Sequence, residues 1–360
     1  MRHGRAVVAT AIGLAMSAAL LGAARLGGGS PATAVGASTA PAWQQGHEHG
    51  QPETSDAPYK GPVERYQWPD PTLPAPPPGR VKHFRVDVFE HVTKVSDETA
   101  PLRVWSFGIN GRFQRGTGVS PPMVVNQGDQ VDITFVNGAS KAMGVDLAHS
   151  LDLHAAELAP NVAFKTIAPG QREHIRFVAS HPGVFLYHCA TEPMVMHLGS
   201  GMAGMFVVKP KGLPHVDKEY WLLQQEYYPG KPGQDGDYNA MMARSPSVVA
   251  FNGYGFQYRE WPIRVRTDEK IRVYLANVGP SLSESFHVIG AVFDRTDVEG
   301  MMGASSQAVS LAPAQGGWVD FSLKRPGAYP FVTHDFADMA RGAMGAFVTQ
   351  GVPMSAARGF

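Results

Sequence analysis

The stretch that decides the fold is APGQREHIRFVASHPGVFLYHC, residues 168–189, because a variant of it returns as APAQGGWVDFSLKRPGAYPFVTHD at residues 312–335. Both contain Ala-Pro-x-Gln, a strand centred on phenylalanine, Pro-Gly, an aromatic residue and then a histidine. Apolar runs broken by turn residues predict β-strands, and their return predicts a duplicated unit. We therefore expect two copies of one β domain, at residues 80–210 and 246–351, joined by a connection at 211–245.

The body of the chain consists of short runs that favour β-strands. Runs such as PPMVVNQGDQVDITFVN, residues 121–137, are separated by Gly, Pro, Asn and Asp, and no full-length amphipathic helix interrupts them. This pattern predicts an all-β fold of the sandwich or barrel type. With 360 residues the chain is long enough to bury a hydrophobic core in each of two domains.

The residues before the first domain have a different composition. A basic start, MRHGR, precedes an apolar run at residues 6–24 and small residues suited to cleavage, which predicts a signal peptide or membrane anchor over residues 1–38. We therefore expect export, to the periplasm or the extracytoplasmic cell surface. Residues 39–79 are rich in Pro, Gly, Ser and Gln and are expected to form an extended linker.

Charge and cysteine content limit the possible partners and cross-links. The 31 basic and 31 acidic residues cancel, and the body of the chain has no Lys/Arg run, so no nucleic-acid partner is expected. The single cysteine excludes a disulfide within the chain. Small molecules and proteins are the expected partners.

The only cysteine lies in a motif typical of a copper site. In FLYHCATEPMVMHLGSGM, residues 185–202, Cys189 is followed by His197 and Met202. A blue copper centre needs two imidazoles, one thiolate and a weak axial methionine sulfur. The remaining imidazole must come from an earlier strand, where HSLDLH begins with His149. A lone cysteine can also be an inert buried thiol, but these residue types at these spacings favour the metal site.

Further histidines in the same two stretches predict a second metal site. His154 lies five residues after His149, and His188 directly precedes Cys189. Because side chains alternate along a strand, each of these histidines is expected to point away from its neighbouring ligand. A three-histidine site with an open position can activate a bound water or anion. The third ligand is expected from the other domain, where the repeated stretch ends in His334.

Two more residues have competing interpretations. Asp152 lies between the histidines of HSLDLH, where a carboxylate either hydrogen-bonds a metal-bound anion and relays a proton or simply occupies a turn. His287, in ESFHVIGAVFD, lies on a predicted strand of the second copy among apolar residues. From this local context alone, a core histidine is the simpler interpretation.

Together and in this order, the motifs resemble those of the copper-containing nitrite reductases, which are trimers of subunits with two cupredoxin domains. The resemblance covers residues 81–351 and extends through GPSLSESFHVIGAVFDRTDVEG and YPFVTHDFADMARGAMG. It implies two cupredoxin-like Greek-key domains in tandem and two coppers per subunit. The implied ligands are His149, Cys189, His197 and Met202 for a type 1 copper, and His154, His188 and His334 of the neighbouring subunit for a type 2 copper.

The same resemblance implies a reaction, in which nitrite is reduced to nitric oxide by one electron from an external donor such as a small cupredoxin or a cytochrome c. Asp152 and His287 match the active-site residues that supply protons, and Ile289 matches the apolar residue over the substrate. The chain departs from the family pattern at Glu157, after HAA, and at Asp335, directly after His334.

Two other functions compete with this hypothesis. A laccase-like multicopper oxidase needs many histidines in His-x-His pairs, whereas the only such pair here is His47 and His49 in the predicted linker. A single-blue-copper electron-transfer or copper-binding protein would use only the four ligands around Cys189. That alternative leaves the second set of histidines and Asp152 without a role.

Overall fold

The computed structural model describes residues 59–114, 116–138 and 144–360. The predicted signal peptide or anchor at residues 1–38, and the part of the predicted linker before residue 59, lie outside the described residues. Within the described ranges, no helix combines the length and the apolar character needed to span a bilayer.

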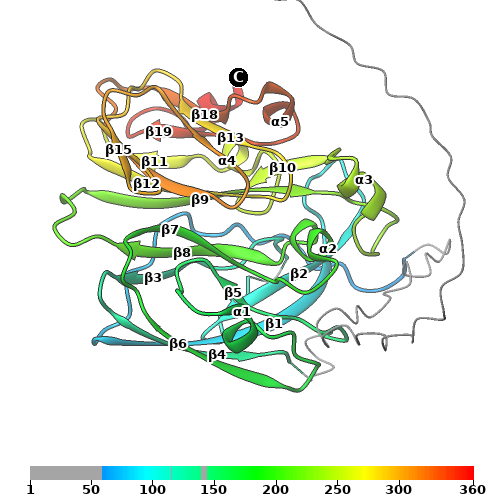
Figure 1. Cartoon of the computed structure of the whole chain (residues 1–360). Coiled ribbons are helices and arrows are strands. Elements are labelled where there is room, and N and C mark those ends of the chain that lie inside the picture. The colour runs from blue at the N-terminus through cyan, green and yellow to red at the C-terminus, as the bar shows by residue number, and fades with distance from the viewer. Residues whose placement is uncertain (1–58, 115, 139–143) are drawn as a thin grey trace, which may run out of the picture. The chain divides into compact units, whose positions relative to one another are not determined.

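The first half of the described chain forms two four-stranded sheets, with strand orders β2-β1-β4-β6 and β3-β8-β7-β5 (Figure 1). β1 pairs in parallel with β4 and β3 with β8, whereas the other neighbours are antiparallel. The elements are β1 (Val81–Thr93), β2 (Leu102–Ile109), β3 (Met123–Asn126), β4 (Gln130–Val136), β5 (Asp152–Leu153), α1 (Pro160–Ala163), β6 (Arg172–Val178), β7 (Gly183–His188), α2 (Met194–Gly199) and β8 (Ala203–Lys209).

The second half repeats this arrangement with extra edge strands, in the orders β10-β9-β12-β17-β14-β15 and β11-β19-β18-β13-β16. The parallel pairs recur as β9 with β12 and β11 with β19. The elements are β9 (Lys218–Tyr227), α3 (Tyr238–Met242), β10 (Val248–Phe251), α4 (Gln257–Glu260), β11 (Ile263–Val265), β12 (Ile271–Gly279), β13 (Glu284–Val288), β14 (Arg295–Val298), β15 (Met301–Gly303), β16 (Ala308–Leu311), β17 (Gly316–Phe321), β18 (Ala328–Thr333), α5 (Phe336–Ala340), β19 (Met344–Thr349) and a final 3₁₀ helix (Met354–Arg358).

Strand β9 occupies the position in the second half that β1 occupies in the first. It lies between β10 and β12, as β1 lies between β2 and β4. Its residues fall inside the stretch 211–245 that the sequence predicted as a connection. The ten-residue run KEYWLLQQEY is therefore part of a sheet, and the true connections lie on either side of it.

Alternate residues of β7 and β9 place the two halves against each other. Phe185 and Tyr187 face the core of the first half, whereas Val184 and Leu186 join Trp221 and other residues of β9, β12 and β17 in a shared cluster. Figure 1 shows the β7–β8 side of the first half next to β9. Because both faces of β7 are covered, the run GVFLY before His188 is continuously apolar and shows no polar alternation.

Residues 64–73 of the predicted linker pack against both halves of the chain, whereas the sequence predicted an extended linker. Glu64 forms a parallel bridge to Thr93 in the first half, and Thr72 forms an antiparallel bridge to Tyr220 in the second. The indole Nε1 of Trp221 donates a hydrogen bond of 3.0 Å to the Asp70 carbonyl oxygen. Composition alone misses this packing because an extended, proline-rich chain can still pair with the edge of a sheet.

Trp221→Ala should lower the free energy of unfolding by about 3–5 kcal/mol, because it leaves a large cavity between the two halves. Trp261→Ala is a matched control, since Trp261 is 59% exposed whereas Trp221 is 1% exposed. The control should lose at most about 1.5 kcal/mol, the scale of its aromatic contact. Urea unfolding measures both, and equal losses would contradict the role of Trp221 in joining the halves.

Candidate metal centres

Three side chains converge in the interior of the first half: His149, Cys189 and His197. Nδ1 of His149 lies 3.2 Å from Nδ1 of His197 and 3.8 Å from Sγ of Cys189. All three side chains are buried, and their possible ligand atoms lie within 4.8 Å of one another. The cluster brings two imidazole nitrogens and one thiol sulfur to a single point.

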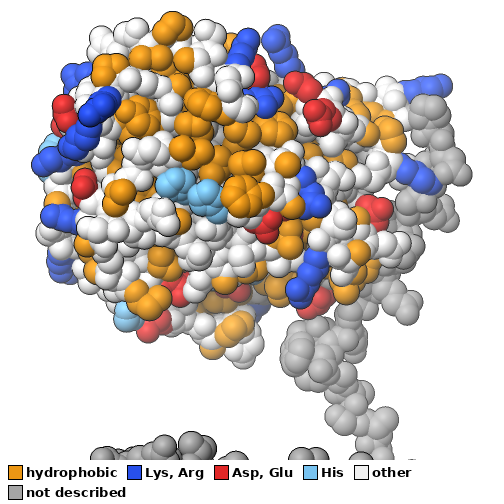
Figure 2. All heavy atoms as spheres, turned by 90° about the horizontal axis from the view of Figure 1, so that it is seen from above, with side chains coloured by type: hydrophobic (Ala, Val, Ile, Leu, Met, Phe, Trp, Pro, Cys, Tyr) orange, Lys and Arg blue, Asp and Glu red, His pale blue; other side chains and the backbone are white. Residues whose placement is uncertain are grey.

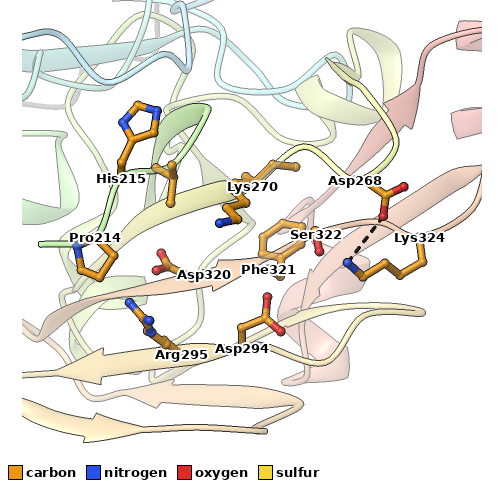
Figure 3. Close-up of a pocket in the computed structure, with 12 residues that line it drawn as sticks. Pro214, His215, Asp268, Lys270, Asp294, Arg295, Asp320, Phe321, Ser322 and Lys324 are labelled. Atoms are coloured by element: carbon orange, nitrogen blue, oxygen red, sulfur yellow. Dashed lines mark ion pairs between the residues drawn. The ribbon is translucent and has the colours of Figure 1, made fainter.

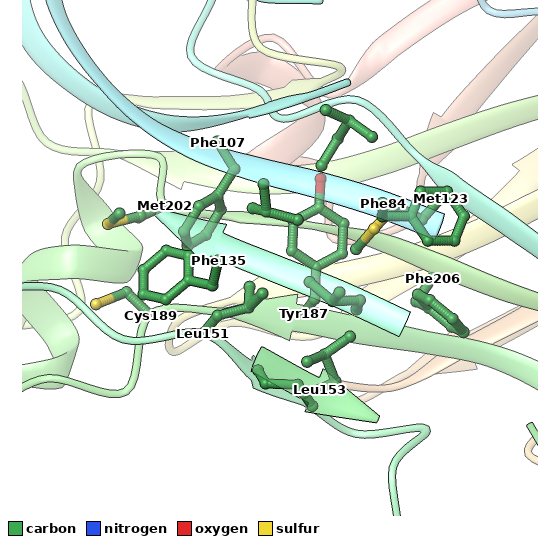
Figure 4. Close-up of a cluster of buried hydrophobic side chains, with 14 of the residues drawn as sticks. Phe84, Phe107, Met123, Phe135, Leu151, Leu153, Tyr187, Cys189, Met202 and Phe206 are labelled. Carbon is green, nitrogen blue, oxygen red and sulfur yellow. The ribbon is translucent and has the colours of Figure 1, made fainter. Parts of the chain in front are cut away.

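The loop after β7 brings the rest of the predicted ligand set to this cluster. Cys189 follows the last residue of β7, and its N–H donates to the Met202 carbonyl oxygen at 3.1 Å. His197 lies in α2, and its carbonyl oxygen accepts from the N–H of Met202 at 3.1 Å. Figure 4 shows the sulfurs of Cys189 and Met202 at the same end of the buried hydrophobic cluster.

Ser150 holds the cysteine loop in place. Its backbone N–H lies 3.4 Å from Sγ of Cys189. Its hydroxyl oxygen accepts from the N–H of Ala190 at 2.9 Å and from the hydroxyl of Thr191 at 3.2 Å. These contacts fix the position of the thiol without the help of a bound metal.

The electrostatics of the cluster favour a thiolate. Burial by itself raises the pKa of the Cys189 thiol, but the imidazoles of His197 and His149 together lower that pKa well below its usual value. Burial lowers the pKa of His149, yet contacts with Cys189 and Glu90 raise it to about 9. A thiolate is the form that binds metals, and a set of one thiolate, two imidazoles and a thioether suits copper.

A second cluster lies at the end of β5 and β7 and consists of Asp152, His154 and His188. Asp152 and His188 are opposite each other in the β5–β7 ladder. Nε2 of His154 lies 2.9 Å from Nε2 of His188, and Oδ2 of Asp152 lies 4.0 Å from the same His188 nitrogen. Nδ1 of His188 donates to the Cys189 carbonyl oxygen at 3.0 Å, so Nε2 is the nitrogen that faces the cluster.

This second cluster opens to the surface of the subunit. His188 is buried, Asp152 is half-buried and His154 is exposed. Desolvation and the neighbouring imidazole of His188 lower the pKa of His154, which favours the neutral form that binds metals. Among the described residues the cluster holds two imidazoles, one fewer than the predicted three-histidine site.

The remaining predicted residues form a separate group on the second half. The rings of His287 and His334 are stacked with their centroids 4.9 Å apart. His287 lies on β13 and donates from Nδ1 to the Gln307 carbonyl oxygen, and His334 directly follows β18. Within one chain, His334 is not part of the cluster formed by His154 and His188.

The interpretation of His287 as a core residue is wrong. On β13 the buried residues are Glu284, Phe286 and Val288, and His287 between the last two is only half-buried. Ile289, the next residue along, is 46% exposed. The alternation of the strand therefore turns His287 toward the outside.

Comparisons with known proteins agree with this geometry. A family model for multicopper oxidases matches residues 163–212. The copper-containing nitrite reductase of Neisseria meningitidis serogroup A is 34% identical over 287 residues, which cover 76% of this chain and 70% of that protein. The enzyme of Neisseria gonorrhoeae of the same name is also 34% identical, over 76% of this chain and 69% of its own length. The chain belongs to the copper-containing nitrite reductase family.

A solved structure supports the same assignment of fold. The copper nitrite reductase from Nitrosomonas europaea superposes with a TM-score of 0.67 and 29% identity, over 78% of this chain and 98% of that one. The predicted fold class is thereby confirmed: the two halves are tandem cupredoxin domains of a nitrite reductase family member.

The side chains of Asp335 and Glu157, the two departures from the family pattern, form contacts away from both clusters. The carboxylate of Asp335 accepts hydrogen bonds from the N–H groups of Ala337 and Asp338, at 3.2 and 3.4 Å, and so caps helix α5. Glu157 is exposed and contacts Ser180 at 2.9 Å and His181 at 3.3 Å. Among the described residues, neither carboxylate hydrogen-bonds a side chain of a candidate ligand.

Two residues beside the first cluster, Ser150 and Glu90, were not predicted from the sequence. Ser150 directly follows His149, so inspection of the residues flanking each ligand could have found it. Glu90 lies on β1, far from the motif in sequence, and contacts His149 only through the fold. No local pattern points to Glu90.

A pocket of about 230 Å³ lies elsewhere on the second domain (Figure 3). It is lined by charged and polar residues, among them His215, Lys270 and Arg295. Asp268 and Lys324 at its edge form an ion pair of 3.5 Å. None of the predicted site residues lines it.

Asp335→Ala should lower the free energy of unfolding by about 1 kcal/mol, because helix α5 loses its N-cap. Asp335→Asn should stay within a few tenths of a kcal/mol of the unmodified protein, since asparagine caps about as well. Chemical unfolding of both variants checks this. If Asp335→Asn also loses stability while Asp335→Ala does not differ from it, the capping role is excluded.

Proposed function

We propose that this protein is a dissimilatory-type nitrite reductase of denitrification, which reduces nitrite to nitric oxide with two copper ions per subunit. The observation that carries the proposal is the presence of two clusters of metal-binding side chains that meet at the dipeptide formed by His188 and Cys189. Membership of the copper-containing nitrite reductase family supports it. In the overall reaction, nitrite takes up one electron and two protons and yields nitric oxide and water.

The residues divide between two copper sites. Bound copper would supply a one-electron couple at the first site and a Lewis-acidic position for nitrite at the second. The proposed ligands are His149, Cys189, His197 and Met202 at the type 1 site, and His154, His188 and His334 of the neighbouring subunit at the type 2 site.

The dipeptide of His188 and Cys189 is the shortest covalent connection between the two sites. Cys189 points into the core and His188 points to the second cluster, so one peptide bond separates ligands of different sites. The hydrogen bond from Nδ1 of His188 to the Cys189 carbonyl oxygen adds a second short connection between the same two residues. This covalent adjacency gives electrons from an external donor a direct through-bond route.

Asp152 and His287 are the proposed proton donors. The Asp152 side chain is 28% exposed, so its carboxyl group can take protons from solvent while it faces the second cluster. His287 has Nδ1 committed to the Gln307 carbonyl oxygen, which leaves Nε2 for the substrate. Ile289, apolar and exposed beside this histidine, would cover the bound nitrite.

We propose a cyclic homotrimer, because each subunit carries two complementary halves of the second site on different surfaces. A contact between the His154 face of one subunit and the His334 face of the next is heterologous, and heterologous contacts form a ring when the rotation between subunits closes. Figure 2 shows exposed hydrophobic side chains around histidines on the second domain. Large exposed apolar groups of this kind mark interfaces; in this domain they include Ile289, Val292, Met301, Met302 and Phe336.

Export and an external donor complete the proposal. The basic start and apolar run of the N-terminal sequence support a signal peptide or anchor and a periplasmic or extracytoplasmic location. The single cysteine provides no Cys-x-x-Cys-His haem attachment in this chain. A separate carrier, such as a small cupredoxin or a cytochrome c, would therefore deliver the electron.

The direct test is anaerobic nitric oxide production by the copper-loaded protein with a chemically reduced donor. Two coppers per subunit and nitric oxide in proportion to the nitrite consumed are expected. One blue copper per subunit without nitric oxide would overturn the proposal in favour of an electron-transfer protein.

His334→Ala should abolish nitrite reduction and remove one of the two coppers, but leave the visible absorption of the copper–thiolate bond intact. The reason is that His334 is assigned only to the second site. His215→Ala, a change at an exposed histidine that lines the separate pocket, is the matched control and should retain full activity. Loss of both coppers in His334→Ala would contradict two separable sites.

Asp152→Asn should retain both coppers and reduce kcat by about 10²–10⁴-fold, the usual contribution of general acid catalysis. The amide keeps the shape of the carboxyl group but cannot donate the proton in the same way. Asp294→Asn, at an exposed carboxylate of the second domain, is the control. Steady-state kinetics decide the matter, and an unchanged kcat in Asp152→Asn would exclude the assigned role.

A further inference from the structure

A buried carboxylate that the proposed reaction does not use lies behind the first cluster. Oε1 of Glu90, on β1, is 3.5 Å from Nε2 of His149. The two side chains are 1% and 0% exposed, so the contact is screened from solvent. It is a direct interaction between an acidic group and the outer nitrogen of a proposed copper ligand.

The orientation of His149 makes this contact specific. Its Nδ1 faces the cluster, 3.2 Å from Nδ1 of His197, and Nε2 is the nitrogen on the opposite side of the ring. A carboxylate at the outer nitrogen holds the proton there, keeps Nδ1 available for metal and makes the imidazole a stronger donor. Glu90 therefore orients the ring and adds electron density to it.

The groups around Glu90 neutralise its negative charge only in part. Its other oxygen accepts a hydrogen bond from the guanidinium of Arg103. Arg103 also bonds Asp146 at 3.0 Å and lies 3.9 Å from Asp235. One guanidinium is thus shared among three carboxylates, so it only partly neutralises Glu90.

We propose that Glu90 is a positioning residue that lowers the reduction potential of copper bound by His149, Cys189, His197 and Met202. This inference rests on the ligand assignment of the proposed function. In the redox step, an external donor gives one electron to copper(II), which becomes copper(I). A buried negative charge stabilises the doubly charged ion more than the singly charged ion, so it opposes this reduction.

The test compares Glu90→Gln with the unmodified protein, as the full-length, copper-loaded chain. The reduction potential is read from a redox titration of the visible copper–thiolate absorption. Glu90→Gln should raise the equilibrium constant for reduction roughly tenfold, the lower end for losing a partner behind a metal ligand. For a one-electron couple this is about 59 mV.

Glu269→Gln is the matched control, because Glu269 is also a buried glutamate that pairs with an arginine, Arg266 at 3.4 Å, but belongs to the second domain. Its equilibrium constant for reduction should stay within about twofold of the unmodified protein, since it contacts none of the proposed ligands. Glu90→Asp is a second variant that keeps the charge but withdraws the carboxylate from His149 by one methylene. Glu90→Asp should raise the equilibrium constant for reduction by less than Glu90→Gln does. If Glu90→Gln does not fold, Glu90→Asp tests the role of Glu90 in its place.

The outcomes separate this inference from the assignment beneath it. An unchanged potential in Glu90→Gln or, failing that, in Glu90→Asp, with the absorption band intact, overturns the role of Glu90 alone. An equal shift in Glu269→Gln also overturns it, because the effect would then be general to buried carboxylates paired with an arginine. Absence of the absorption band from the unmodified protein overturns the ligand assignment and this inference with it.

Discussion

The alternation of side chains at the end of β7 is the constraint on which both clusters depend. His188 and Cys189 are neighbours on an extended chain, so their side chains must point to opposite sides. The facing segment obeys the same rule, with His149 buried and His154 exposed. Two antiparallel stretches thereby supply a buried cluster around the thiol and a second cluster in which His188 is buried and His154 is exposed. Neither cluster can move without displacing the other.

The duplicated fold relates the candidate site residues of the two domains. The pair β13–β18 occupies the place that β5–β7 occupies in the first domain. The outward histidine persists, as His188 in one domain and His334 in the other. At the next position, where the first domain has Cys189, the second has Asp335, which caps a helix. The second domain thus has an exposed imidazole at this position, and a helix-capping carboxylate stands where the first domain has the thiol of its first cluster.

The sequence predicted the features that depend on local order. The repeated stretches identify the two domains, and the spacing of Cys189, His197 and Met202 identifies the first cluster. Tertiary contacts decide the rest: β9 lies within the stretch expected to be a connection, and residues 64–73 lie within the stretch expected to be an extended linker, yet both pair with strands. The outward direction of His287 was available from strand alternation, whereas the contact between Glu90 and His149 follows only from the pairing of distant segments.

The segment at residues 64–73 has a consequence for how the chain matures. It bridges to Thr93 in one domain and to Tyr220 in the other, yet it is synthesised before either. Strand β9, which contains Tyr220, leaves the ribosome only after the whole first domain. During synthesis the part of the segment around Asp70 and Thr72 must therefore wait undocked, and its contact with Trp221 forms late, after completion of β9.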